Sequence, residues 1–286
     1  MTEIVKTPFR YPGSKSSFTN TVKSYILHND LQGCKIVEPY AGSAAVTLAL
    51  VSEGICSEGL ISERDPLMYS FWKVALYNPS ALIEKIINAD VSLKTWHELR
   101  PLLNNDSPDD GDIVEMAFAA LFFNRTNFSG VLHTGPIGGQ DQSSAYKIDC
   151  RFNRKDLILR IKAIATLSKK IEVNFGDAIE IVKEYKRRTS PFFYIDPPYF
   201  IQGRKLYRHH YKLKDHVALA KALNSAKFNW MLSYDNHDVI RNLYNDFKQV
   251  EKAFQYSTRV SKSENELLIT NMGIPEEWKY RQLEVA

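Results

Sequence analysis

Two separate regions of the sequence alternate short apolar runs with helix-like segments, and this alternation constrains the fold more than any other feature. In the first region, runs at 34–37 and 60–62 flank a helix expected over 44–51. Helices between such runs bring the strands back in parallel, which predicts an α/β fold with a mainly parallel sheet covered on both faces. The second region continues the pattern, with strands expected at 171–175, 192–195, 230–233 and 267–270 and helices at 177–188, 213–226 and 237–247.

The sequence between these two regions has a different pattern. Helix-like apolar spacing appears at 82–87 and 114–123, whereas 126–144 is rich in Gly, Asn, Ser and Gln. A chain of 286 residues, 44% of them hydrophobic, is long enough for one large core and a smaller unit. We therefore expect a mainly helical domain inserted into the sheet domain. The predicted boundaries are 66–154 for the inserted domain and 1–65 with 155–286 for the sheet domain.

Charge and cysteine content limit the classes of protein to consider. The formal net charge of +4 permits a polyanionic partner without requiring one. Cys34, Cys56 and Cys150 lie far apart in the sequence and form no metal-type cluster. The N-terminus lacks the apolar core of a signal peptide, and no apolar run approaches the length that spans a bilayer. We expect a cytoplasmic protein with no metal site and no membrane contact.

The strongest chemical signal is the motif Asp196-Pro197-Pro198-Tyr199, directly after the apolar run 192–195. Open α/β sheets bind ligands at the carboxyl ends of their strands, where this acid is expected. The two prolines fix the backbone and remove two N–H donors. Asp196 and the Pro197 carbonyl can then accept the two N–H groups of an exocyclic amine, while Tyr199 stacks on the base. The alternative is a structural aspartate before a proline turn.

A small-residue turn, Glu38-Pro39-Tyr40-Ala41-Gly42-Ser43, lies between the first predicted strand and its helix. Such a turn forms a nucleotide cradle at the helix N-terminus. Glu63 ends the next strand, where an acid can accept hydrogen bonds from a ribose diol. The same pattern occurs in dehydrogenases, in methyltransferases and in βαβ units that bind no ligand. It therefore does not distinguish among these alternatives.

Two further motifs carry polar groups to the same region. The basic and aromatic turn Arg10-Tyr11-Pro12-Gly13-Ser14-Lys15 could hold a carboxylate such as a methionine tail, or it could be a solvated turn. Phe175-Gly176-Asp177 ends another predicted strand. Asp177 can cap the next helix, and it can also accept a hydrogen bond from the amine of a bound adenine.

In this order, the motifs resemble those of the Dam-like class of DNA adenine-N6 methyltransferases. Stretches 122–130, 233–236 and 266–271 resemble further motifs of that class, so the resemblance runs from about Phe9 to Asn271. It implies a Rossmann-like methyltransferase sheet of about seven mostly parallel strands with an inserted DNA-recognition domain. It also implies a prokaryotic or phage enzyme that transfers the methyl group of S-adenosyl-L-methionine to a flipped-out adenine in double-stranded DNA.

The resemblance also assigns roles to individual residues. It assigns catalysis to Asp196, Pro197, Pro198 and Tyr199. It assigns cofactor binding to Tyr11, Lys15, Glu38, Pro39, Tyr40, Ala41, Gly42, Ser43, Glu63, Asp177, Ala178 and Asp196. The chain departs from the usual pattern at Ala44, where a second glycine is common, and at Glu63 and Asp65, where Asp and Asn are usual. Alanine is small enough for the cofactor to fit, although with weaker affinity.

Basic residues that follow the catalytic motif are expected to track DNA phosphates and to cover the flipped base. The set comprises Arg204, Lys205, Arg208, His210 and Lys212. Tyr207 and Tyr211 lie between these basic residues in the sequence. In the middle domain, the predicted contacts to base edges or phosphates are Arg125, Asn127 and His133. A solvated loop is the alternative for the first set, and structural roles are the alternative for the second.

Rival functions stay open on the sequence alone. The exocyclic amine could belong to cytosine in DNA or to adenine in RNA, and the chain could be a catalytically silent DNA-binding relative. A nicotinamide-dependent dehydrogenase lacks support because the Gly-x-Gly-x-x-Gly fingerprint is missing. A restriction endonuclease of the same specificity is a further expected partner.

Overall fold

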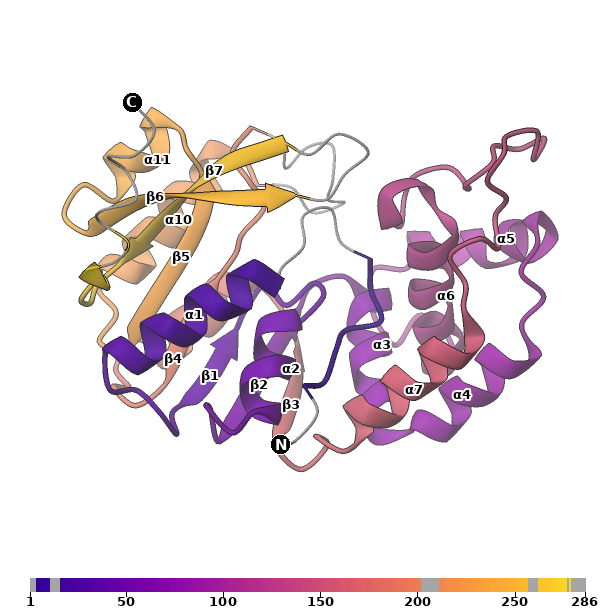
Figure 1. The fold of residues 1–286 in the computed structure, drawn as a ribbon, viewed down its shortest axis with the longest axis horizontal. Helices are drawn as coiled ribbons and strands as arrows, with labels where there is room; N and C mark the ends of the chain where they lie inside the picture. The colour runs from indigo at the N-terminus through magenta and orange to yellow at the C-terminus, as the bar shows by residue number, and fades with distance from the viewer. Residues whose placement is uncertain (1–3, 11–15, 202–210, 257–261, 277, 279–286) are drawn as a thin grey trace.

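The computed structural model describes residues 4–10, 16–201, 211–256, 262–276 and 278, and its centre is a seven-stranded sheet (Figure 1). The strand order is β3-β2-β1-β4-β5-β7-β6. Strands β1 to β5 are parallel to one another, whereas β7 is antiparallel to both β5 and β6. The sheet is therefore the mostly parallel α/β sheet that the sequence predicts. The strands are β1 Lys35–Glu38, β2 Glu58–Glu63, β3 Ile171–Phe175, β4 Phe192–Ile195, β5 Asn229–Asp235, β6 Lys248–Tyr256 and β7 Lys262–Thr270.

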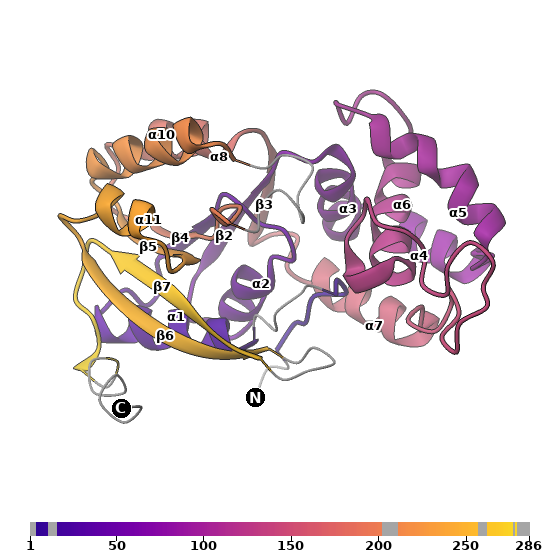
Figure 2. The ribbon, with the colours of Figure 1, turned by 90° about the horizontal axis from the view of Figure 1, so that it is seen from above.

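Alternate side chains of the strands belong to different apolar cores, one on each face of the sheet. In β4, Phe192 and Tyr194 join the core that includes α1, α2 and α3, whereas Phe193 and Ile195 join the core that includes α8, α10 and α11. All four side chains are at most 1% exposed, because helices cover both faces (Figure 2). These helices are α1 Ser16–His28, α2 Ala45–Ser52, α3 Pro66–Tyr77, α8 Ala178–Tyr185, α10 Leu213–Asn224 and α11 Asp238–Leu243.

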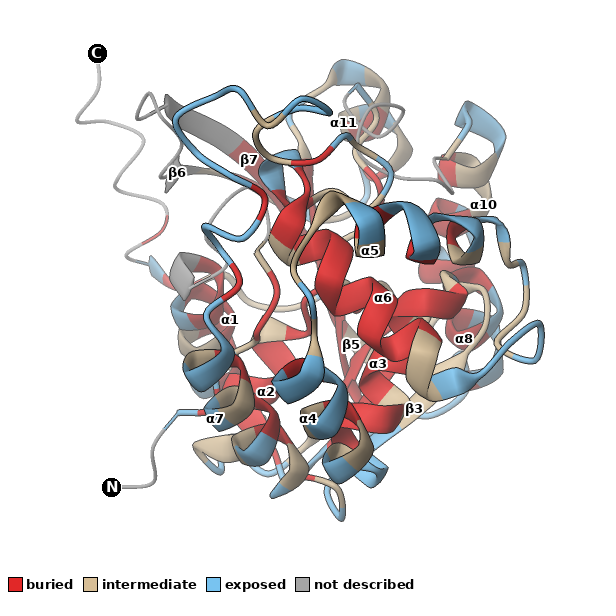
Figure 3. Ribbon diagram, turned by 90° about the vertical axis from the view of Figure 1, so that its right-hand side faces the viewer, coloured by how far each residue is buried: buried red, intermediate tan, exposed pale blue. Residues whose placement is uncertain are grey.

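A group of helices lies beside the sheet, on the right of Figure 1. Its central helix α6 is buried along most of its length against α3, while α4, α5 and α7 present exposed residues outward (Figure 3). The first helix of the group, α3, begins after Asp65. The Asp65 side chain caps this helix by accepting from the backbone N–H groups of Leu67 and Met68. The remaining elements are α4 Pro79–Asn88, α5 Leu93–Leu99, η1 Arg100–Asn104, α6 Ile113–Thr126, η2 Phe128–Gly130 and α7 Arg154–Ala165.

The predicted division at 66–154 stays a prediction, because the apolar core does not stop at either boundary. Phe71 of α3 and Phe122 of α6 belong to the same buried cluster as Ile36 of the sheet. At the other boundary, α7 packs on α3 and α4 and extends the helical packing to Ala165. In the part of the chain that is described, no helix is both long and apolar enough to cross a bilayer.

Several elements were not predicted individually from the sequence, among them α1 and β6. In α1, Phe18, Val22 and Tyr25 are fully buried at a helical spacing, and this pattern was available in the sequence. Strand β6 is harder to detect because it lies at the edge of the sheet and pairs with β7 alone. Its first residues are Lys, Gln, Val and Glu, and Val250 joins the apolar core.

Candidate functional site

The carboxyl ends of four parallel strands meet at one pocket. The volume that the centres of water molecules can occupy in this pocket is about 180 Å³. Glu38 ends β1, Glu63 ends β2, Asp177 follows β3 and Asp196 follows β4, and all four line this strand-end pocket. The loop after α6 closes it from the helical side, through residues 130–133. The strand ends that the sequence singled out are therefore brought together. The other predicted residues that line the pocket are Pro39, Tyr40, Ala41, Gly42, Ser43, Ala178, Pro198 and His133.

The turn between β1 and α2 has a tightly bonded backbone. Gly42 and Ala44 both adopt left-handed conformations, with φ of 47° and 46°. The Gly42 N–H donates to the Glu63 carboxylate, and the indole N–H of Trp72 donates to the Gly42 carbonyl at 3.0 Å. For a residue with a side chain, the left-handed region costs about 1 to 2 kcal/mol. This cost explains physically why glycine suits the position that Ala44 occupies.

Two buried glutamates anchor this turn from either side. The Glu38 carboxylate accepts from the backbone N–H of Thr47 at 3.1 Å and from its hydroxyl at 2.6 Å, which ties the end of β1 to α2. Burial and, to a smaller extent, the charge of Asp65 raise the pKa of Glu63 to about 7, against the opposing bond from Gly42. Near neutral pH, Glu63 therefore exchanges between an acid that donates and a carboxylate that accepts.

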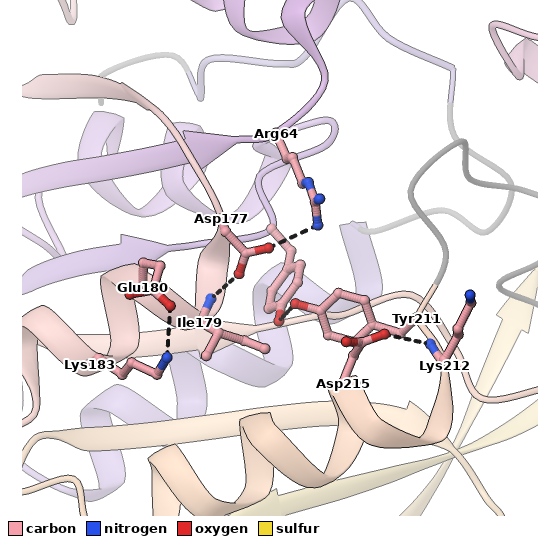
Figure 4. Close-up of polar contacts among 9 residues, drawn as sticks. Arg64, Asp177, Ile179, Glu180, Lys183, Tyr211, Lys212 and Asp215 are labelled. Atoms are coloured by element: carbon pink, nitrogen blue, oxygen red, sulfur yellow. Dashed lines mark hydrogen bonds and ion pairs between the residues drawn. The ribbon is translucent and has the colours of Figure 1, made fainter. Parts of the chain in front are cut away.

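The side of the pocket that Asp177 and Tyr40 line is held by three polar contacts, which Figure 4 shows. Asp177 accepts from the Ile179 N–H at 2.8 Å, which caps α8, and from the Arg64 guanidinium at 2.9 Å. The Tyr40 and Tyr211 hydroxyls share a hydrogen bond of 2.7 Å, which joins the turn after β1 to the residues before α10. The expected capping role of Asp177 is confirmed.

Asp196 to Tyr199, which we call the acid–proline corner, is supported by residues of β5 and β7. The Ser233 hydroxyl donates to Asp196 Oδ1 at 2.9 Å. The Tyr199 hydroxyl lies beside the Glu266 carboxylate, a side chain that is 2% exposed. Burial raises the pKa of Tyr199 well above its usual value, and the charges of Asp196 and Glu266 raise it further, so its ring stays neutral.

Asp235 supports the segment that follows the corner. Its two carboxylate oxygens accept from the backbone N–H groups of Phe200 and Ile201, at 2.9 and 2.8 Å. Asp235 lies opposite Glu266 in the pairing of β5 with β7. We call Ser233, Asp235 and Glu266 the β5–β7 support. It holds the corner against the sheet from one side.

The predicted DNA-contacting residues fall into different environments. Lys212 and His133 are exposed, and His133 also lines the pocket. Arg125 is partly buried and donates to the carbonyls of Arg151 and Pro8. Predicted residues Tyr11, Lys15, Arg204, Lys205, Arg208 and His210 lie outside the described residues.

The structure contradicts the prediction that Asn127 contacts DNA. Its side chain is fully buried. It accepts from the Trp96 indole at 2.6 Å and donates to the carbonyls of Val131 and Leu132 at 3.2 and 2.7 Å. These bonds shape the loop after α6, so Asn127 has a structural role.

Several residues at the site were missed in the sequence. Arg64 lines the pocket and contacts Asp177, which no local pattern reveals. Tyr211 was noted only with the basic run, and its bond to Tyr40 was not predicted. Met68 and Asn124 come from α3 and α6, which the sequence did not connect to the pocket. The β5–β7 support lies within stretches 233–236 and 266–271, which were noted only for their resemblance to family motifs.

Comparison with known proteins assigns this arrangement to a family. The family model of the D12 class N6 adenine-specific DNA methyltransferases matches residues 11–258. The type II methyltransferase M.MjaIII of Methanocaldococcus jannaschii is 24% identical over 207 residues, which cover 68% of this chain and 69% of that protein.

Solved structures give weaker matches. The Pyrococcus horikoshii protein PH1948 aligns with a TM-score of 0.41 and 11% identity, over 92% of this chain and 84% of that one. Protein LMOf2365_1472 of Listeria monocytogenes aligns with a TM-score of 0.39 and 10% identity, over 93% and 72% of the two chains. These scores are too low to support an argument about function.

Proposed function

The chain belongs to the D12 class of N6 adenine-specific DNA methyltransferases, and from this premise we propose that it methylates the exocyclic amine of an adenine in double-stranded DNA. The protein is a methyltransferase, and S-adenosylmethionine is its methyl donor. One observation carries the proposal for this chain. Asp196 and Pro198 of the acid–proline corner line the same pocket as the three acids that end or follow β1, β2 and β3.

The pocket has the chemistry that S-adenosylmethionine requires. Glu38 and Glu63 can accept hydrogen bonds from hydroxyl and ammonium groups, and their negative charge suits a cationic ligand. Val46 and Met68 provide an apolar wall for the adenine ring. The set proposed to hold the cofactor comprises Tyr11, Lys15, Glu38, Pro39, Tyr40, Ala41, Gly42, Ser43, Glu63, Asp177, Ala178 and Asp196.

Asp196 and the Pro197 carbonyl are proposed to hold the target amine. Ser233 orients the Asp196 carboxylate by its bond to Oδ1. In that orientation, Asp196 accepts one N–H and the Pro197 carbonyl accepts the other, which turns the nitrogen lone pair toward the cofactor side of the pocket. When bound, S-adenosylmethionine supplies an electrophilic methyl group on a sulfonium. The Asp196 charge also stabilises the positive charge that grows on the nitrogen during transfer.

Tyr199 is proposed to stack on the target base. A base inside a duplex is out of reach, so the adenine must rotate out of the helix before its amine meets Asp196. The position of the Tyr199 hydroxyl beside Glu266 restricts the ring, and a restricted ring loses less entropy when a base stacks on it. Exposed Lys212 and His133 are proposed to contact the DNA around the pocket.

Two substrates share the chemistry of this site and are alternatives: cytosine N4 in DNA and adenine in RNA. The family assignment favours adenine in DNA. A restriction endonuclease of the same specificity is a proposed partner in the cell. It is supported by the type II methyltransferase to which this chain is similar.

The proposed substrate is tested with S-adenosylmethionine that carries a tritiated methyl group. Duplex DNA of mixed sequence and RNA duplexes of the same sequence are each incubated with the full chain. The proposal predicts label in the DNA and none above background in the RNA. Label that enters only the RNA would overturn the choice of DNA, and no label in either would favour a catalytically silent relative.

A further inference from the structure

An arginine cluster surrounds the segment just before the first predicted motif. It comprises Arg10, Arg125 at the end of α6, Arg151 in the loop before α7, and Arg160 of α7. Arg125 reaches two parts of the chain, because its guanidinium donates to the carbonyl of Pro8 at 3.1 Å and to that of Arg151 at 2.8 Å. One side chain therefore holds the N-terminal segment against the loop before α7.

Arg160 contacts the same segment from the other side. Its guanidinium donates to the carbonyl of Thr7 at 2.8 Å and forms an ion pair with Asp156 at 2.9 Å. Both arginines donate to backbone carbonyls, which fixes their positions. These bonds leave the charge of Arg125 unneutralised, whereas Arg160 is also paired with Asp156.

The positive charges of the cluster act on one another. Burial and, after it, the nearby charges of Arg10 and Arg160 lower the pKa of Arg125 to about 10. The pKa of Arg10 is lowered as well. Burial is the larger cause, and the positive charge of Arg151 is the second. Among the described residues, Asp156 is the carboxylate that opposes this effect at Arg125. An anion placed beside the cluster would relieve this repulsion.

The cluster is adjacent to the strand-end pocket through one side chain. The Asn124 amide accepts from the Arg10 N–H at 2.7 Å and donates to the carbonyls of Arg10 and Gly130, both at 2.8 Å. Asn124 and Gly130 both line the pocket. Arg151 is exposed and Arg10 is partly exposed, so both can reach a ligand beside the pocket opening.

We propose that Arg10 and Arg151 bind backbone phosphates of the DNA next to the flipped adenine, with Arg125 and Arg160 as their structural base. This inference rests on the proposed function. A guanidinium suits a phosphate because its parallel N–H groups match two oxygens. Phosphate contacts position a duplex without reading its sequence, so the cluster anchors the DNA while other groups select the site.

The test is the salt dependence of DNA affinity, measured by fluorescence anisotropy with a labelled duplex and no cofactor. Arg10→Gln and Arg151→Gln keep the backbone bonds to Asn124 and Arg125, because only backbone atoms of Arg10 and Arg151 make them. Each substitution is expected to make the slope of log affinity against log salt shallower by about 1, equally for several sequences. Arg151→Lys should keep the wild-type slope, because it keeps the charge.

Arg187→Gln is the matched control, since Arg187 is exposed and lies beyond α8, outside the cluster and the pocket. Thermal unfolding of each variant verifies that it is folded. Suppose that the wild-type protein binds and methylates DNA, and that both glutamine variants keep the wild-type salt slope. This result would overturn the proposed phosphate contacts and leave the proposed function standing. A wild-type protein that binds an RNA duplex with this slope but not DNA would overturn the proposed partner. A wild-type protein that binds neither would overturn the proposed function itself.

Discussion

The acid–proline corner and the loop after α6 lie on the same pocket, but the chain holds them in different ways. The corner is held by side chains of the sheet, because Ser233 donates to Asp196 and Glu266 lies beside the Tyr199 hydroxyl. The loop is held by interior amides that bond to its backbone, as Asn127 does to the carbonyls of Val131 and Leu132. A polar motif in the sequence therefore marks a reactive site in one case and an internal support in the other.

The difference teaches where substitutions act. In the corner, Asp196 faces the pocket and its support lies behind it, so removal of its carboxylate should change chemistry and leave the fold intact. In the loop, the polar side chain of Asn127 lies inside, and the exposed groups include Phe128, Ser129 and His133. Removal of Asn127 should therefore change the fold before it changes chemistry.

The largest effect is expected at the corner. Asp196→Ala removes the group that orients the amine and stabilises its charge, and kcat should fall by about a thousandfold or more. The free energy of unfolding should stay close to wild type, and most of the affinity for S-adenosylmethionine should remain. Asp246→Ala is the control, because Asp246 is an exposed acid away from the pocket. Turnover within tenfold of wild type in Asp196→Ala would remove Asp196 from its role.

The second effect tests the other side of the comparison. Asn127→Ala leaves the buried Trp96 indole N–H and two loop carbonyls without their bonds, and should reduce the free energy of unfolding by about 2 to 4 kcal/mol. Urea denaturation measures this loss. Ser129→Ala, at an exposed position of the same loop, should change stability little. A fully stable Asn127→Ala protein that binds DNA poorly would restore the original prediction of a DNA contact.

A smaller effect is expected from the support behind the corner. Glu266→Leu removes the carboxylate beside the Tyr199 hydroxyl and should lower kcat/KM for DNA by about tenfold, because the ring is then less restricted when the base stacks on it. Glu266→Gln keeps an acceptor and should recover part of the loss. A double-mutant cycle with Tyr199→Phe measures the coupling. Strictly additive losses would show that Glu266 does not act through Tyr199.

The smallest effect concerns the cofactor and its dependence on pH. Because burial raises the pKa of Glu63 to about 7, the residue is mostly protonated below that pH and mostly a carboxylate above it. The carboxylate accepts hydroxyl groups and attracts a cation, so affinity for S-adenosylmethionine should rise severalfold as pH rises from about 6 to 8. Calorimetry across this range measures the change. Glu63→Gln should flatten the profile, and an unchanged profile would exclude Glu63 as its source.

Residues at strand ends could be predicted well from the sequence. Parallel strands place their carboxyl ends at one edge, so Glu38, Glu63, Asp177 and Asp196 meet once the strands are recognised. Each prediction needed only a short apolar run and the polar residue that follows it.

Groups that depend on distant pairing could not be predicted in the same way. Glu266 reaches Tyr199 because β7 lies antiparallel to β5, and β7 was expected only as a late strand without a partner. Asn127 was misjudged because a sequence does not reveal whether a polar side chain in a glycine-rich stretch faces solvent or the interior. The Arg64 contact with Asp177 likewise depends on the alignment of β2 with β3.

The identity of the methylated nucleoside tests the central claim most directly. Duplex DNA that contains all four bases is treated with the wild-type protein and S-adenosylmethionine, digested to nucleosides and measured by mass spectrometry beside an Asp196→Ala control. The account predicts N6-methyldeoxyadenosine from the wild type and none from the variant. N4-methyldeoxycytidine as the product, or N6-methyldeoxyadenosine at equal levels from both proteins, would contradict it.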